Sequence, residues 1–164
     1  MPSFDRREFL EGSRIAIAFL TEKIVNGDFD SLHGLVTDEL FDQIKDGFGA
    51  LTFEERQKFI IKKDEILGCG IKRIDIIEDD DSTSIEILVV CHAIRNLSQI
   101  QQSAARDEFL NDNLYVLNYR FVKDVKDEDW TVSSMIHSKL ADEMEKQKKK
   151  LLKKLEEIPF SKKK

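Results

Sequence analysis

The feature that most constrains the fold is a pair of aromatic and β-branched runs within residues 113–140. Four polar turn-forming residues, Lys-Asp-Glu-Asp, separate the two runs, and this pattern predicts a β-hairpin. Side chains alternate between the two faces of a strand. One face of the first strand therefore carries Tyr115, Leu117, Tyr119 and Phe121, and one face of the second carries Trp130, Val132, Ser134 and Ile136. Such apolar faces need a cover, and the N-terminal helices are the expected one.

A second hairpin is predicted before the first. Residues 66–78 and 85–95 are strand-like and are joined by an acidic turn at residues 79–82. The later strand is apolar on both faces over residues 87–91. This pattern is typical of a strand that lies inside a sheet or is covered on one side by a partner.

Folding the second hairpin about its turn places Cys69 near Cys91 and His92, and Gly68 and Gly70 predict a bulge or a sharp bend there. The two cysteines lack metal-ligand spacing, and the three histidines are scattered. We therefore predict no metal site and no cofactor. Both cysteines are expected to be reduced and to act as small apolar groups.

Three helices are predicted before the strands. The first covers residues 4–26 and is apolar nearly all round in its middle, which indicates a helix covered on several sides. The second begins after Asp28 as its cap, with Thr37 or Asp38 as a point of restart. A capping-box pattern opens a third helix over residues 53–63. Helices followed by paired strands indicate an α+β fold with an antiparallel sheet.

Two further segments complete the chain. Residues 96–112 have no clear period, apart from a short helical segment at 104–110, and are predicted to form a long excursion between strands. The tail at residues 141–158 is helical by composition, with Leu140, Met144, Leu151, Leu155 and Ile158 on one side. Its remaining surface is basic and carries Lys146, Lys148, Lys149, Lys150, Lys153 and Lys154. We divide the chain into an α+β domain at residues 1–140 and a basic amphipathic helix with a frayed end at residues 141–164.

Charge is distributed unevenly along the 164 residues. Residues 139–164 contain ten Lys and five acidic side chains, a balance of +5, whereas the other 138 residues carry 16 basic and 27 acidic side chains, a balance of −11. An acidic body argues against general nucleic-acid binding, while the basic tail suits an anionic surface. No apolar run approaches the roughly 20 residues of a membrane span, and the first ten residues contain no targeting pattern.

Two local strings resemble one known family. The first is Phe-Leu-Glu-Gly-Ser-Arg at residues 9–14, and the second is Asp-Trp-Thr-Val at 129–132, which leads into His-Ser-Lys-Leu at 137–140. Together with the order of helices and strands, they resemble the family of m-AAA protease-interacting protein one, which belongs to the Tim-forty-four-like superfamily. A protein of the mitochondrial large ribosomal subunit is a further relative. The likeness runs from about residue 9 to residue 140 and does not extend into the basic tail.

The resemblance implies a fold, a place and a role. The implied fold is cone-shaped and nuclear-transport-factor-two-like, with helices packed into the concave side of a curved sheet so that a pocket remains. The implied place is the mitochondrial matrix, peripheral to the inner membrane. The implied role is that of an adaptor or chaperone-like protein, which holds imported inner-membrane subunits and links them to the matrix-side AAA protease. Small regulatory subunits of the calcium uniporter are the client class associated with the family.

The favoured function is a non-catalytic client-binding module, and we expect no enzymatic activity. Its pocket would use aromatic residues, which offer large contact areas at little entropic cost. The alternative is that these residues form only the core. The candidate pocket residues are Trp130, Tyr115, Tyr119, Phe121 and His92, together with side chains of the first helix.

Two other functions remain open. An isomerase or dehydratase would need an acid-base residue in the pocket, for which the candidates are His92, Asp75 and His137, with Tyr115 or Tyr119 as donors. No nucleophile elbow, phosphate loop or paired-carboxylate motif supports catalysis. Alternatively, the basic tail anchors the protein to anionic lipid or to the ribosome. The tail is otherwise a solvated helix or a coiled-coil arm.

Overall fold

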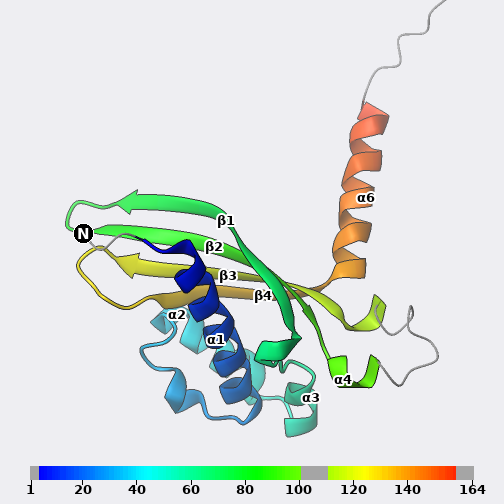
Figure 1. Ribbon diagram of the computed structural model, residues 1–164, viewed down its shortest axis with the longest axis horizontal. Helices are drawn as coiled ribbons and strands as arrows, with labels where there is room; N and C mark the ends of the chain where they lie inside the picture. The colour runs from blue at the N-terminus through cyan, green and yellow to red at the C-terminus, as the bar shows by residue number, and fades with distance from the viewer. Residues whose placement is uncertain (1–3, 101–110, 158–164) are drawn as a thin grey trace, which may run out of the picture.

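The computed structural model describes residues 4–100 and 111–157 and shows helices packed against one open sheet (Figure 1). The predicted helix at residues 104–110 and the end of the tail, with Ile158, lie outside the described residues. In chain order, the elements are α1 (Arg6–Val25), the 3₁₀ turn η1 (Phe29–Leu32), α2 (Asp38–Gly49), α3 (Phe53–Gln57), the 3₁₀ turn η2 (Lys63–Glu65), β1 (Ile66–Glu78), β2 (Thr83–Ile94), α4 (Leu97–Ile100), β3 (Leu114–Asp124), β4 (Thr131–Lys139) and α6 (Leu140–Glu157).

The sheet is a four-stranded antiparallel meander in the order β1-β2-β3-β4. The α+β class and both predicted hairpins are therefore confirmed. Helices α1, α2 and α3 lie on one face of the sheet, which we call the inner face, and α6 projects from the opposite side (Figure 1). The inner-face residues buried against the helices include Ile87, Val89, Cys91, Ala93, Leu117, Tyr119, Phe121 and Val132.

Helix α1 lies across the inner face and supplies much of the core. The side chain of Asp5 caps its N-terminus by accepting the backbone N–H of Glu8, as expected for an Asp in this position. Ile17, Leu20 and Ile24 are at most 1% exposed. Their spacing of three, four and seven residues places them on the stripe that faces the sheet.

The predicted second helix is interrupted. Its first part, after Asp28, forms only the turn η1, and α2 begins at Asp38, where the hydroxyl of Thr37 caps it by accepting Leu40 N–H. The cause is a tertiary contact between this segment and the start of β4. Val132 N–H donates to Leu35 O, and Thr37 N–H donates to Val132 O. These bonds hold the chain extended between η1 and α2, so a continuous helix is not formed.

The third helix is shorter than predicted. It has the predicted capping box but ends at Gln57 and does not reach residue 63. The side chain of Thr21 on α1 explains the early end, because its hydroxyl accepts the Ile61 N–H and donates to the Ile61 carbonyl. Thr21 and Ile61 are both buried, so this side chain replaces the helical hydrogen bonds that the segment gives up.

Two strands contain irregular pairings. The register of β1 shifts between Ile66 and Gly68, which confirms the bulge predicted beside the glycines. In β4 the register also shifts, since Arg120 pairs with Ser134 while Phe121 pairs with Val132.

The β4 bulge corrects one expectation. The extra residue, Ser133, reverses the alternation of faces. Val132 is therefore buried, whereas Ile136, predicted to share its face, is 56% exposed on the outer face. Met135 and His137 take the inner positions opposite Tyr119 and Leu117.

The expectation of reduced cysteines is wrong. Cys69 and Cys91 are direct partners in the β1–β2 pair, and a disulfide joins them. Directly opposed residues of antiparallel strands hold their Cβ atoms within a few ångströms. The predicted proximity of the two thiols was therefore correct, and the predicted oxidation state was not.

Candidate functional site

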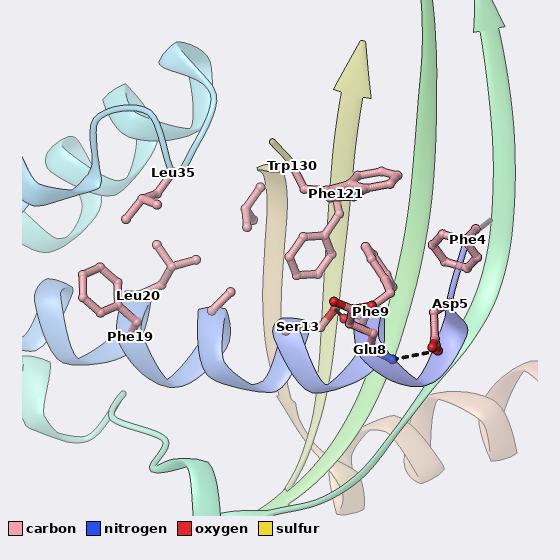
Figure 2. Close-up of a pocket in the computed structure, with 13 residues that line it drawn as sticks. Phe4, Asp5, Glu8, Phe9, Ser13, Phe19, Leu20, Leu35, Phe121 and Trp130 are labelled. Carbon is pink, nitrogen blue, oxygen red and sulfur yellow. Dashed lines mark hydrogen bonds between the residues drawn. The ribbon is translucent and has the colours of Figure 1, made fainter. Parts of the chain in front are cut away.

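An apolar groove lies between α1, the loop before α2 and the ends of β3 and β4, and we call it the α1 groove (Figure 2). Its volume is about 480 Å³, within the range of ligand-binding pockets. It is lined by Phe4, Asp5, Glu8, Phe9, Gly12, Ser13, Ala16, Phe19, Leu20, Leu35, Phe121, Trp130 and Val132.

Phe9 is the centre of an aromatic cluster at one end of this groove. Its ring centroid lies 5.0 Å from that of Trp130 and 5.5 Å from that of Phe121, and both contacts are edge-to-face. Phe4 lies 5.4 Å away on the other side. These are the separations that aromatic pairs favour. The cluster connects α1 to the β3–β4 hairpin and leaves ring faces along the groove.

The groove is hollow because the α1 residues along its middle are small, with larger side chains at both ends. Gly12, Ser13 and Ala16 form the low part of the helix surface, and nothing lies within 4 Å of where a Cβ atom on Gly12 would be. The Ser13 hydroxyl is satisfied because it donates to the Phe9 carbonyl at 2.8 Å. The small residues therefore leave apolar space that none of the residues described by the structure fills.

The rim of the groove exposes large apolar groups. Phe19 and Leu35 are each 39% exposed and Phe4 is 53% exposed, whereas Leu20 and Phe121 beneath them are buried. Figure 2 shows Leu35 approaching from the loop that faces α1. An apolar ligand in the groove would therefore remove ring and methyl surface from water on two sides.

One end of the groove is acidic. Asp5 and Glu8 line it at the N-terminus of α1, where Asp5 Oδ1 accepts the Glu8 N–H at 3.1 Å. The helix N-terminus stabilises these carboxylates. A ligand with a basic group beside its apolar part would match this end.

A second cluster lies on the inner face away from the groove. The Tyr119 hydroxyl and His137 Nε2 are 2.6 Å apart, and the ring of Phe59 stacks on His137 at 4.1 Å. Burial raises the pKa of Tyr119. Burial, with a smaller contribution from Arg95, lowers the pKa of His137 from 6.5 to about 3. Both side chains are therefore neutral at pH 7.

The structure does not gather the five predicted pocket residues in one place. Trp130 and Phe121 line the α1 groove. Tyr119 is fully buried beneath the helices and so belongs to the core. Tyr115 lines a different pocket, with Arg95 and His137. His92 is exposed and lies on the outer face of the sheet beside Met144 of α6.

The candidate acid-base residues are also dispersed. Asp75 pairs with Arg73 at 2.7 Å on the exposed edge strand, far along the sheet from His137. His92 lies on the outer face, so only His137, Tyr119 and Tyr115 share the inner face. Within residues 4–100 and 111–157, no group of three His, Cys, Asp or Glu side chains is arranged to hold a metal ion.

Helix α6 carries the predicted lysines on an exposed surface. Its described residues include Lys146, Lys148, Lys149, Lys150, Lys153 and Lys154. The apolar side chains Met144, Leu151, Leu152 and Leu155 are 45–62% exposed. None of the described helices is long and apolar enough to cross a membrane.

Sequence reasoning expected first-helix side chains in the pocket without singling out Phe4, Phe9 or Phe19, and it missed Leu35. A signal for Phe9 and Phe19 was present, because α1 carries more apolar side chains than one stripe can bury. These two side chains line the groove. Leu35 had no such signal, since its position depends on the backbone pairing with Val132. Comparison of the chain with protein-family models, curated proteins and solved structures gave no match.

Proposed function

We propose that the protein is a non-catalytic adaptor of the mitochondrial matrix that holds apolar segments of imported inner-membrane subunits. The observation that carries this proposal is the α1 groove, with its unfilled volume of about 480 Å³ and its exposed aromatic rim. The resemblance described above supplies the cellular setting and the partner, the matrix-side AAA protease at the periphery of the inner membrane. It also supplies the finer description of the fold as a cone-shaped, nuclear-transport-factor-two-like domain.

The groove suits a transient client. Its walls combine aromatic rings with small residues, so a client side chain gains contact area without rearranging the groove. Phe19, Leu35 and Phe4 are exposed already, and burying them contributes about 25 cal/mol per Å² of apolar surface. This is the energetic basis for gripping an apolar segment and then releasing it.

The acidic end of the groove gives the proposed client a direction. Asp5 and Glu8 stand at one end, while Leu35 and Phe19 lie toward the other (Figure 2). An apolar segment that begins with Lys or Arg would place its charge against the carboxylates. Loops on the inner side of membrane proteins carry an excess of Lys and Arg. Membrane spans flanked by such residues would suit this end of the groove, and newly imported membrane subunits contain spans of this kind.

The test uses the double variant Phe19→Ser/Leu35→Ser. Both side chains are partly exposed on the groove rim, so their loss removes the apolar walls while the core stays intact. The matched control is Ile15→Ser, which changes a 51% exposed side chain on the same helix outside the groove. Tagged proteins are expressed in mitochondria, and captured proteins are identified by quantitative mass spectrometry.

We expect the wild type and Ile15→Ser to recover inner-membrane subunits and the AAA protease. Recovery of the subunits by the groove variant should fall by about tenfold or more, since two apolar side chains of the groove rim are removed. Equal recovery by the groove variant and the control would refute the groove as the client site. Recovery of neither class of protein by the wild type would refute the adaptor role.

A second candidate function, anchoring to an anionic membrane surface, is supported by α6. Leu140, Met144, Leu151 and Leu155 follow helical spacing along one side. The opposite side carries Lys146, Lys149, Lys150 and Lys153. Helices of this kind lie in the membrane interface, where each lysine contributes about 1 kcal/mol. The charge of the helix therefore favours anionic lipid as the surface that covers its exposed apolar side.

Co-sedimentation with vesicles tests this anchoring. The full chain is compared with a chain ending at residue 140 and with Lys149→Glu/Lys153→Glu, using anionic and neutral vesicles. We expect only the full wild-type chain to sediment, and only with anionic vesicles. Binding by all three proteins, or by none, contradicts a membrane role for α6.

A further inference from the structure

A pocket on the inner face, separate from the α1 groove, combines cationic and aromatic side chains. It has a volume of about 330 Å³ and lies between α3 and the end of the sheet that holds the end of β2, the start of β3 and the end of β4. Phe48 and Phe59 form an apolar wall, with ring centroids 4.8 Å apart. Arg95 and Tyr115 form the polar side. Nothing in the proposed adaptor role uses this pocket.

Arg95 is held in place but has no anionic partner among the described residues. One of its terminal nitrogens donates to the Gln57 carbonyl at 3.2 Å, and the other lies 3.5 Å from the Tyr115 hydroxyl. The guanidinium carbon is 5.4 Å from the centroid of the Tyr115 ring. Its Nε is buried without a hydrogen-bond partner, and none of the ion pairs between described residues involves it.

The remaining charges of the pocket leave it positive. Lys58 supplies a second cation, and Glu55 supplies one carboxylate. The Oε2 atom of Glu55 already accepts the Thr52 N–H at 2.9 Å as part of the α3 capping box. His137 stays neutral at pH 7, because burial and the nearby Arg95 both oppose its protonation. A partly buried guanidinium without a counter-ion costs solvation free energy, and a bound anion would offset that cost.

We propose that this pocket binds a small organic carboxylate, whose carboxylate group pairs with Arg95 and the Tyr115 hydroxyl and whose apolar part lies against Phe48 and Phe59. A single planar guanidinium matches the two oxygens of a carboxylate. The aromatic wall favours an aryl or short acyl group over a free inorganic anion, and the small volume excludes a larger ligand.

Benzoate is the probe for this site, and benzamide is its neutral isostere. Backbone amide signals of the ¹⁵N-labelled full-length protein are followed during titration at constant ionic strength. We expect benzoate to shift the signals of Arg95, Tyr115 and His137 along saturable curves. Benzamide should shift them at least about tenfold more weakly, because it lacks the charge that pairs with the guanidinium.

Three variants identify the groups responsible. Arg95→Gln should weaken benzoate binding by about tenfold or more, and Tyr115→Phe, which keeps the ring, by about threefold. Arg73→Gln, an exposed arginine on β1, is the matched control and should bind as the wild type does. Should Arg95→Gln fail to fold, Arg95→Lys keeps the cation but not the planar fork and is expected to bind about tenfold more weakly.

The outcomes are distinct. Unsaturable shifts, equal shifts with benzamide, or equal affinity of the wild type, Tyr115→Phe and the folded Arg95 variant would overturn the proposal. Equal weakening in Arg73→Gln would overturn it as well, since general charge would then explain the binding. The α1 groove shares none of these residues, so failure here leaves the adaptor proposal standing, and failure of the adaptor proposal leaves this one.

Discussion

The hydroxyl oxygen of Tyr119 and the Nε2 atom of His137 lie 2.6 Å apart on neighbouring strands. The two residues are not direct partners in the β3–β4 register, where Met135 stands opposite Tyr119. The bond is therefore diagonal and depends on the bulge at Ser133, which turns the His137 side chain to the inner face. With Phe59 stacked on the imidazole at 4.1 Å, the pair connects the β3–β4 hairpin to the segment after α3.

This pair predicts a pH-dependent stability. The native pKa of His137 is about 3 and its unfolded value is 6.5, so the unfolded chain binds the proton more tightly. The contribution of His137 to stability is complete above pH 6.5 and is lost as pH falls toward 3. We expect about 1 to 2 kcal/mol of this loss between pH 7 and pH 5.

The measurement is urea unfolding of the wild type and of Tyr119→Phe/His137→Phe at both pH values. The double variant removes both polar groups, so no buried hydroxyl is left without a partner. The carboxylates are the same in the two proteins. The difference between the two proteins in how much the free energy of unfolding changes from pH 7 to pH 5 therefore isolates the contribution of the histidine. An equal change in the free energy of unfolding in both proteins would show that His137 is not buried in its neutral form.

Trp130 and Phe121 should respond differently to truncation although both line the α1 groove. Phe121 is 4% exposed, and its change to Ala should cost about 3–5 kcal/mol of unfolding free energy. Trp130 is only partly buried, with Lys123 Nζ 5.5 Å from its ring centroid. We expect Trp130→Ala to cost about 1–2 kcal/mol and to weaken capture of client proteins. A cost equal to that of Phe121→Ala would mean that the indole is a core residue.

The hydroxyl of Thr21 should contribute more to the free energy of unfolding than an exposed helix cap does. It bonds both the N–H and the C=O of Ile61 at 3.1 Å, in a buried site. Thr21→Val keeps the shape and leaves two buried backbone groups without a partner, so we expect a loss of about 2–4 kcal/mol. Thr52→Val, which removes an exposed helix cap, should cost about 1 kcal/mol. Similar losses in the two variants, measured by thermal or urea unfolding, would contradict this account.

Much of the fold was predictable because local pattern and tertiary structure agree there. The alternation at Tyr115, Leu117, Tyr119 and Phe121 gave the correct inner face of β3, and the glycines of β1 marked its bulge. The errors lie where distant backbone contacts override local preference. Val132 pairing with Leu35 and Thr37 interrupts the second helix, and no pattern within that segment encodes the pairing.

The site was less predictable than the fold. Residues were assigned to one pocket because they are aromatic or titratable, but their positions depend on which face the helices cover. His92 differs from Cys91 by one residue and so lies on the outer face. Tyr115 and Trp130 belong to opposite ends of the hairpin, separated by the length of β3. Of the five predicted pocket residues, only Trp130 and Phe121 are close to α1, and only these two line the groove.

The Cys69–Cys91 disulfide leads to a prediction about stability. It closes a loop of 22 residues, and in the chain-entropy model such a link stabilises a protein by about 3 kcal/mol. Cys69→Ala/Cys91→Ala should therefore unfold at lower urea concentration than the oxidised wild type. Reduction of the wild type should have a similar effect and should leave the double variant unchanged. No difference between oxidised and reduced wild type would contradict a stabilising disulfide.

The same disulfide leads to a prediction for the proposed compartment, because structural disulfides persist mainly in oxidising surroundings. Cys91 is completely buried, whereas Cys69 is only partly buried and lines two surface pockets, so the bond is shielded from reductants on the Cys91 side alone. We expect this partial shielding to slow reduction, so that the bond stays oxidised in the matrix. Thiol trapping in intact mitochondria, with the double alanine variant as the blank, measures the oxidised fraction. A fully reduced pair would contradict this prediction. The stability of the protein in the matrix would then be that of its reduced form.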